Sequence, residues 1–478
     1  MHNRLAAVLL SLFAAPTLLA QDAASASPKD PLRDTVRGAV AWIARQALPV
    51  RDVEGAVLFP ASEGSKMPPA TNIYGGSAGV SIFLENAAAV LDDAKARELA
   101  DRAMKGLKSA RHVDSRDRVS WAKGQMMGAD GLYTGDAGVG QAFLVRHALR
   151  HDAEALKDAI DVGDALLARA RVDGNEMSWG VQEDIIFGDA GTALFLLELG
   201  QASKEKRFLE AAKAVGHSLV NAAAHAASKA DPSKQLPVWM FHMGGNDVHM
   251  PNFSHGTAGV AYALVRIGAA LGDEALLQAG KEGAQWLIEN AVADGECLKW
   301  AARESSKPVY MGGWCHGPAG TGRLFLLLAS VTGEARYLEV AKKSAAFVVE
   351  YAANAEKATA DGTKPYVPPS FCCGVAGVTD FFCDLSRVTH DPAHIAFAKK
   401  AAAYIVDVSI VDGDGRKWKN GQSVPGGPVA SDSSGHNVEL MLGAAGEALA
   451  LLRVITLDSA VDPVRGLPDR VVTVAAKK

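Results

Sequence analysis

A four-residue element, Gly-x-Ala-Gly, recurs along this chain and constrains its fold more than any other feature. Its last glycines, at positions 79, 138, 191, 259, 320, 377 and 446, are 53 to 69 residues apart, which is typical of tandem structural repeats. Each copy opens an apolar stretch, as in Val260 to Gly268, whose side chains are apolar on nearly every face of a helix. The sequence therefore predicts seven buried helices, each beginning at a glycine-rich turn.

A second, amphipathic helix is expected before each Gly-x-Ala-Gly element. In Glu274 to Lys281, for example, charged residues occupy one face only. Such helices are expected at 33–48, 91–110, 151–170, 203–226, 272–293, 334–353 and 391–408. Because no single helical hairpin can bury its own apolar face, the hairpins must pack around a shared centre. We expect an all-α fold, an α/α toroid of seven inner and seven outer helices, formed by residues 27–458 as one domain.

Five tryptophans lie in short β-like runs between an outer helix and the next element, and are expected to form aromatic turns at the end of the toroid. They are Trp121, Trp179, Trp239, Trp300 and Trp418. Asp136 and Asp189, inside two of the Gly-x-Ala-Gly elements, are expected to help cap the inner helices. If all hairpins run the same way, the seven inner N-termini converge at one end, where we expect the functional site.

The two ends of the chain fall outside the repeats. Residues 1–26 carry one early positive charge, an apolar run and small residues, which is typical of a secretory signal peptide with cleavage after Ala20 or Ala26. We expect an exported protein, periplasmic in a Gram-negative source, with no stable membrane anchor after cleavage. Residues 459–478 lack the repeat pattern and are expected to form a peripheral tail.

Composition excludes several classes of protein. The 478 residues are 49% hydrophobic and 22% charged, as in globular domains, with a net charge of −5 and no long basic tract. Nucleic acid is therefore not an expected partner. Five cysteines are too few to form a disulfide scaffold in a chain of this length.

Three of the cysteines occupy equivalent places in the repeats. Cys315 lies just before one Gly-x-Ala-Gly element, and Cys372 and Cys373 lie just before the next. Neighbouring repeats would bring these thiols together, and their donor set suits zinc, Zn²⁺, with a fourth position open to water or substrate. His316 is an alternative ligand or a proton donor. A vicinal disulfide, or a pairing with Cys315, is the structural alternative, whereas Cys297 and Cys383 are expected to be core residues.

These residues resemble the lanthionine synthetase C-like family over about residues 33–455. The resemblance rests on the seven glycine-rich repeats, the Trp-Cys-x-Gly motif at Trp314 to Gly317, and the Cys-Cys-Gly motif at Cys372 to Gly374. It implies a toroid of seven inner and seven outer helices and a catalytic zinc held by Cys315, Cys372 and Cys373. Where the family has a tyrosine after the first zinc ligand this chain has His316, and the arginine seen shortly before that motif in bacterial cyclases is missing.

The resemblance also implies two further site residues and a reaction. His255 matches the family's active-site histidine in its His-Gly-x-Ala-Gly motif, and Asp184 matches an acidic residue four positions before a Gly-x-Ala-Gly element. The implied reaction is the addition of a peptide or small-molecule thiol to an α,β-unsaturated acceptor such as a dehydroamino acid. His255 or His316 would then protonate the resulting enolate, and Asp184 would orient or charge the histidine.

Two other functions remain open from the residues alone. One is a noncatalytic, zinc-stabilised binding scaffold. The other is glycoside hydrolysis, since α/α toroids of six hairpins commonly bind saccharides through aromatic loops and paired carboxylates. Asp184, Asp189 and the tryptophans of the turns would then carry the function.

Overall fold

The computed structural model describes residues 30–122, 128–180, 182–243, 245–360, 367–419, 435–459 and 461–470. Residues Pro31–Lys478 belong to one compact unit. In its described part this unit contains fourteen α-helices and short strands paired as two-stranded hairpins. The predicted signal peptide, 1–26, lies outside the described residues.

The seven inner helices follow the Gly-x-Ala-Gly elements as predicted. The first glycine of each element is the extended residue preceding the helix, as at Gly256, and the helix begins at the next residue. Most residues of these helices are buried, on more than one face. They are α2 (Ser77–Leu91), α4 (Asp136–Arg150), α6 (Asp189–Ser203), α8 (Thr257–Leu271), α10 (Pro318–Thr332), α12 (Val375–Thr389) and α14 (Ala444–Ile455).

The seven outer helices alternate with the inner ones along the chain. They are α1 (Pro31–Arg45), α3 (Ala94–Ser109), α5 (Ala153–Arg169), α7 (Lys206–Asn221), α9 (Glu274–Asn290), α11 (Ala335–Ala360) and α13 (Pro392–Asp407). Tight turns join several inner helices to the outer helix that follows. At one such turn Asp92 ends α2 with a φ of 49°, and the Asp93 side chain accepts a hydrogen bond from the Ala96 N–H to cap α3.

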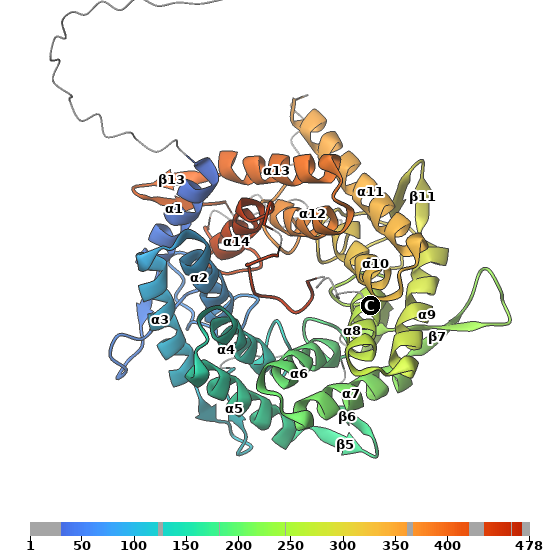
Figure 1. Ribbon diagram of the computed structural model, residues 1–478, viewed down its shortest axis with the longest axis horizontal. Helices are drawn as coiled ribbons and strands as arrows, with labels where there is room; N and C mark the ends of the chain where they lie inside the picture. Colours follow the sequence, from blue (N-terminus) through green and yellow to red (C-terminus); the bar gives the residue numbers. More distant parts are fainter. Residues whose placement is uncertain are drawn as a thin grey trace, which may run out of the picture. The chain divides into compact units, whose positions relative to one another are not determined.

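The inner helices close into a ring. Each packs against the next, and α14 packs against α2, so the repeat order returns to its start (Figure 1). The first outer helix, α1, packs against α14 and completes the outer layer at the same seam. The prediction of an all-α, α/α toroid of seven inner and seven outer helices is confirmed. No helix in the described part of the chain is both long and apolar enough to cross a lipid bilayer.

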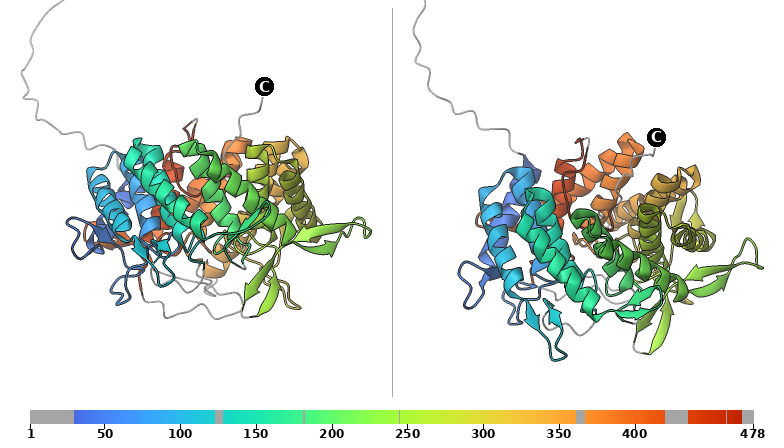
Figure 2. Two further views of the ribbon diagram at one scale, coloured as in Figure 1. Left: turned by 90° about the horizontal axis from the view of Figure 1, so that it is seen from below. Right: turned by 60° about the horizontal axis from the view of Figure 1, so that its bottom comes forward.

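Seven antiparallel hairpins lie between the helices, several of them gathered at one end of the ring (Figure 2). They are β1–β2 (Leu48–Pro49, Val57–Leu58), β3–β4 (His112–Val113, Val119–Ser120), β5–β6 (Arg171–Asp173, Glu176–Ser178), β7–β8 (Ala224–Ala227, Gln235–Val238), β9–β10 (Met240–Met243, Asn246–His249), β11–β12 (Val292–Asp294, Cys297–Lys299) and β13–β14 (Ile410–Asp412, Gly415–Lys417). Most of these loops lead from an outer helix to the next inner helix.

Four of the five tryptophans predicted to form aromatic turns donate a hydrogen bond to the end of an outer helix, and among the described residues no such bond is seen for the buried Trp121. The indole N–H of Trp179 donates to the Leu166 carbonyl of α5 over 2.8 Å. Trp239, Trp300 and Trp418 make the same kind of bond, each 2.8 Å long, to the carbonyls of Leu219, Leu287 and Ile405. The predicted aromatic turns therefore satisfy carbonyl groups that a helix C-terminus leaves without partners.

Asp136 and Asp189 differ from their expected capping role. Each is the first residue of its inner helix, and neither side chain caps that helix. The carboxylate of Asp136 accepts instead from the backbone N–H groups of Trp121 and Ala122, and that of Asp189 from the N–H of Trp179. Both carboxylates hold an aromatic turn against the start of an inner helix, because backbone N–H groups of that turn lie within hydrogen-bond distance of the carboxylate.

The segment after α14 is not peripheral where the structure describes it. Residues 461–470 run into the centre of the ring (Figure 1), where Val464 and Leu467 are buried. The fully buried Asp469 carboxylate accepts from the Trp314 indole N–H over 2.9 Å. This part of the expected tail fills the middle of the ring, because the inner helices leave space there that buried side chains must occupy.

Candidate metal centre

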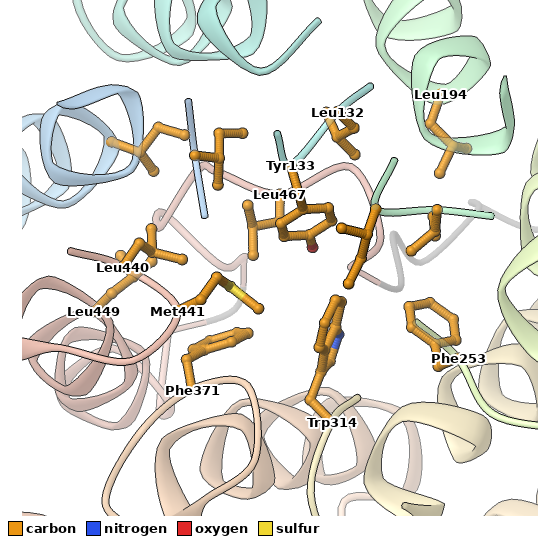
Figure 3. Close-up of a cluster of buried hydrophobic side chains, with 14 of the residues drawn as sticks. Leu132, Tyr133, Leu194, Phe253, Trp314, Phe371, Leu440, Met441, Leu449 and Leu467 are labelled. Atoms are coloured by element: carbon orange, nitrogen blue, oxygen red, sulfur yellow. The ribbon is translucent and has the colours of Figure 1, made fainter. Parts of the chain in front are cut away.

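The turns entering the inner helices meet at one end of the ring. The residue three positions before each Gly-x-Ala-Gly element is apolar and buried. Five of these residues, Leu132, Phe253, Trp314, Phe371 and Leu440, lie in an apolar cluster with Leu467 (Figure 3). The inner N-termini therefore meet at one end of the ring, as expected from the repeats. Turns of neighbouring repeats lie side by side there.

A circle of backbone hydrogen bonds joins these turns, and we call it the collar. It runs through the residues two positions before each Gly-x-Ala-Gly element, where the N–H of one repeat donates to the carbonyl of another. The bonds are Tyr74 to Tyr133, Tyr133 to Ile186, Ser254 to Cys315, Cys315 to Cys372, Cys372 to Met441, and Met441 back to Tyr74. The collar fixes the backbone of the cysteine-bearing turns.

Three sulfur atoms lie together on the collar. The Sγ of Cys373 lies 3.3 Å from that of Cys315 and 3.4 Å from that of Cys372, and all three atoms lie within 4.8 Å of one another. All three cysteines are free thiols, at separations far longer than the roughly 2.05 Å of a disulfide bond. The structure therefore brings together the three residues that the sequence predicts to be metal ligands.

The chemistry of this cluster fits a bound cation. Hydrogen bonds from the thiols of Cys315 and Cys372 lower the pKa of Cys373 well below its ordinary value. Cys315 and Cys372 are buried, and Cys373 is half-buried. Three sulfur donors at these separations are a ligand set for zinc or another metal that prefers sulfur. His316 is not part of the cluster that the described residues form.

Tyr74 contacts the cluster, although sequence reasoning did not single it out. Its hydroxyl donates to the Sγ of Cys372 over 3.3 Å. Burial raises the pKa of this phenol well above its ordinary value, so the hydroxyl keeps its proton and remains a donor. The signal that would have found Tyr74 is its repeat position, two residues before a Gly-x-Ala-Gly element, which it shares with Cys315 and Cys372.

His255 and Asp184 form a second polar group on the same end of the ring. The Nδ1 of His255 lies 2.8 Å from Oδ2 of Asp184, whose side chain is buried. The His255 ring stacks on Phe187 at 5.3 Å between centroids and lies 4.5 Å from the Phe241 ring. The carboxylate and the two aromatic rings fix the orientation of the imidazole.

Asp184 also explains an interruption in the collar. Its Oδ1 accepts from the backbone N–H groups of Ile186, Phe187 and Gly188, at 2.9, 2.6 and 3.1 Å. The Ile186 N–H is therefore occupied within its own repeat, whereas the equivalent N–H groups of the collar donate to another repeat. Here the Asp184 to His255 contact joins the third and fourth repeats instead.

His316 belongs to the fifth repeat, directly after Cys315, and follows the repeat that carries His255. Its ring packs edge-to-face against His255 at 5.9 Å between centroids. Burial, with the neighbouring His255, lowers the pKa of His316 to about 4. The imidazole of His316 is therefore neutral near pH 7. His255, His316 and Cys373 all occupy the position directly before a Gly-x-Ala-Gly element.

Cys297, Cys383 and Asp189, a candidate residue for glycoside hydrolysis, all make contacts typical of structural residues. Cys383 is fully buried in α12, and the buried Cys297 donates to Glu350. Asp189 is buried at the start of α6 and holds the backbone of Trp179. These contacts agree with core roles for both cysteines, and they leave Asp189 inside the fold rather than on an open saccharide-binding surface.

Comparison with known proteins gives one family and a set of similar folds. The sequence profile of the lanthionine synthetase C-like protein family matches residues 68–464. Among solved structures, nisin cyclase matches with a TM-score of 0.56 and 14% identity over 91% of this chain and 96% of its own. No curated protein sequence matches the chain.

Two sugar-acting proteins show weaker similarity. A sugar epimerase from a ruminal bacterium matches with a TM-score of 0.49 and 11% identity over 90% of this chain and 99% of its own. A family 76 glycoside hydrolase, an α-mannanase from Bacteroides thetaiotaomicron, matches with a TM-score of 0.47 and 11% identity over 89% and 96%. At these scores neither bears on function.

Proposed function

This chain belongs to the lanthionine synthetase C-like family, and from that membership we propose that it is a zinc enzyme that adds a thiol to an α,β-unsaturated acceptor. The observation that carries the proposal is the meeting of three cysteine sulfurs, from two neighbouring repeats, beside a carboxylate-bound histidine. The acceptor is a dehydroamino acid or a similar electrophile, and the thiol belongs to a peptide or a small molecule.

Cys315, Cys372 and Cys373 would hold the zinc ion. When bound there, zinc would keep a substrate sulfur in its thiolate form near neutral pH. As thiolates on the metal, the three cysteines would leave electron density on a bound sulfur, and the Tyr74 hydroxyl fixes Cys372 by its hydrogen bond. The collar supports both turns, so the ligands are positioned before the substrate arrives.

His255 is the proton donor in this proposal. Addition forms a carbon–sulfur bond and moves the π electrons of the acceptor onto its α-carbon, which then takes a proton. Asp184 contacts Nδ1 of His255 and orients the ring, which leaves Nε2 to deliver the proton. His316, with a pKa of about 4, is too weak a base to take the proton that the thiol releases, so that proton would replace the one that His255 donates.

Replacement of single residues tests this function. We expect Cys315→Ser and Cys372→Ser to lose stoichiometric zinc and thiol addition to a dehydroalanine peptide, whereas Cys297→Ser keeps both. Asp184→Asn is expected to keep zinc and the fold, since the amide oxygen still accepts from the backbone, and to slow addition by roughly 10²-fold or more. Metal analysis and addition rates measure these effects.

The outcomes separate this proposal from its alternatives. Full zinc content and full addition activity in Cys315→Ser would contradict the metal centre. Zinc binding with no addition activity, and a function unchanged by His255→Ala, would instead indicate a noncatalytic scaffold. Saccharide hydrolysis that survives a chelator and cysteine replacement would indicate a glycoside hydrolase.

We also propose that the protein is exported, on the basis of residues 1–26 alone. Cell fractionation and N-terminal sequencing of the mature protein test this. A mature chain that begins after Ala20 or Ala26 in the periplasmic fraction supports export, and an intact Met1 in the cytoplasm contradicts it.

A further inference from the structure

An apolar cavity adjoins the metal centre, and the proposed mechanism does not use it. It has a volume of about 260 Å³ and lies among α11, α12 and α13. Val348 and Tyr351 of α11 and Phe397 of α13 contribute to its lining, and Cys373 forms part of its wall. The cavity therefore reaches one of the three candidate zinc ligands.

Cys373 is also the ligand that a molecule can approach. It is half-buried, whereas Cys315 and Cys372 are buried at 2% and 3% exposure. Tyr351, whose phenol pKa is raised by burial and by the neighbouring Cys373, stands in the same wall. A group attached to a sulfur at the metal would thus meet this cavity first.

The wall between the cavity and the cysteines depends on glycine. A Cβ on Gly313 would lie 2.8 Å from the Cys373 carbonyl carbon, and a Cβ on Gly312 would lie 2.9 Å from the Tyr351 ring. Both separations are too short for a real side chain. The turn that carries Trp314 and Cys315 can therefore lie directly against Cys373 and Tyr351.

The lining leaves little for a charged ligand to bind. The Tyr404 hydroxyl, in the same wall, already donates to the Val367 carbonyl over 2.8 Å. Lys400 is the charged residue of the described lining, and it already has an interaction partner. Valine, alanine, glycine and aromatic residues form most of the remainder. A cavity of ~150 Å³ with such a lining already binds benzene in another protein, so this one has room for an aromatic ring or a branched aliphatic group.

We propose that this cavity takes a bulky apolar group attached close to the sulfur of the substrate thiol. The inference rests on the proposed function, because it places that sulfur at the zinc beside Cys373. It defines the substrate class as thiols with an aromatic or branched aliphatic group within one or two carbons of the sulfur. Small polar thiols would bind the zinc without gaining from the cavity.

Titration calorimetry on the zinc-loaded protein tests the inference. We expect benzyl mercaptan to bind at least about tenfold more tightly than 2-mercaptoethanol, since burial of a phenyl group is worth that much or more. Val348→Phe fills the cavity and should remove this preference while it leaves the Kd of 2-mercaptoethanol within about twofold. Val349→Phe makes the same change at a neighbouring position that is 40% exposed and should retain the preference.

A second variant tests the same prediction in case Val348→Phe does not fold. Ala401→Leu also adds bulk to the lining, from α13 rather than α11, and should act as Val348→Phe does. Equal affinities for the two thiols in the zinc-loaded wild type, or a preference that survives in folded, zinc-containing Val348→Phe and Ala401→Leu, would overturn the cavity assignment alone. Failure of both thiols to bind the zinc-loaded wild type would overturn the proposed function with it.

Discussion

At the scale of single residues, the contacts of the site depend on repeat position more than on residue type. Tyr74, Cys315 and Cys372 occupy the same place before their Gly-x-Ala-Gly elements, and the collar holds all three backbones. A hydroxyl from the first repeat therefore lies against a sulfur from the sixth. The ring brings these repeats together because the seventh repeat alone lies between them.

Tyr74→Phe should weaken zinc binding. The hydroxyl stabilises the Cys372 thiolate, and zinc binding needs that thiol deprotonated, so loss of the donor should lower zinc affinity by roughly tenfold. Competition with a chelator at fixed pH measures the affinity. Tyr133→Phe changes the equivalent position in the second repeat, away from the sulfur cluster, and should leave zinc affinity unchanged. Equal affinities in all three proteins would show that the bond to Cys372 has no effect on the metal.

The metal and imidazole residues could be predicted from sequence because they lie inside repeated motifs. Cys315, Cys372 and Cys373 directly precede glycine-rich turns, and the alternation of helices makes two such turns neighbours. Tyr74 could not be predicted from chemistry, since a single tyrosine has no motif of its own. The backbone contacts of Asp184 also depend on a local turn that its residue type does not specify.

At the scale of elements, the first residue of an inner helix ties an aromatic turn to that helix. Asp136 and Asp189 do this in the second and third repeats, but in different electrostatic surroundings. Asp136 is paired with the buried Arg169 over 2.7 Å. Burial instead raises the pKa of Asp189 to about 7. The same substitution should therefore have opposite consequences at the two positions.

Asp189→Asn should remove a pH dependence of stability. The folded state binds a proton at Asp189 up to about pH 7, whereas the unfolded chain releases it near its ordinary pKa of 3.8. The free energy of unfolding therefore falls as pH rises through this window. We expect the variant to gain about 1–3 kcal/mol relative to wild type between pH 4 and pH 8, as measured by urea unfolding.

Asp136→Asn is the matched comparison. It leaves the Arg169 guanidinium buried without one of its carboxylates, so the free energy of unfolding should fall by about 3 kcal/mol near pH 7. If Asp189→Asn were destabilising to a similar extent at pH 8, the assigned protonation of Asp189 would be incorrect.

The helical elements could be predicted well, and their end contacts could not. Periodicity indicated both helix layers and their alternation, because apolar and amphipathic patterns are local. The indole bonds of Trp179, Trp300 and Trp418 join a loop to a helix thirteen residues earlier. Such bonds depend on the path of the loop, and the pattern of residue types in the sequence does not determine that path.

At the scale of the whole molecule, the segment 461–470 forms part of the core. Arg453 of α14 pairs with Asp380 and Asp384 of α12, and the Arg470 side chain lies 3.2 Å from Asp380. The Asp469 carboxylate also supports Trp314, the residue before a candidate zinc ligand. The end of the chain is therefore coupled by contact to the turn that carries Cys315.

Leu467→Ala tests whether this segment is part of the core. Leu467 is 4% exposed at the centre of the ring, and its truncation should lower the free energy of unfolding by about 2–4 kcal/mol. Val461→Ala, at a site that is 70% exposed, is the control and should be close to neutral. Denaturant unfolding measures both, and a neutral Leu467→Ala would restore the expectation of a peripheral tail.

This segment was not predictable because its role depends on the closed ring. Seven converging turns leave a central space whose size no local pattern specifies. The stretch 461–470 has only Val461, Val464 and Leu467 as aliphatic side chains apart from its prolines, and nothing in it distinguishes the buried two from the exposed Val461. The toroid itself was predictable because its repeats are numerous and regularly spaced. Which residues fill the centre of the toroid depends on how the seven repeats pack together into a closed ring.

Closure of the collar has a consequence for synthesis of the chain. The Met441 N–H must find the Tyr74 carbonyl, and α1 must find α14, so the first and last repeats need one another. A growing polypeptide on the ribosome carries the first six repeats well before the seventh emerges. Until the seventh repeat emerges, the α2 face that packs on α14 and the Tyr74 carbonyl lack their partners, so the ring closes only after nearly the whole chain has been made.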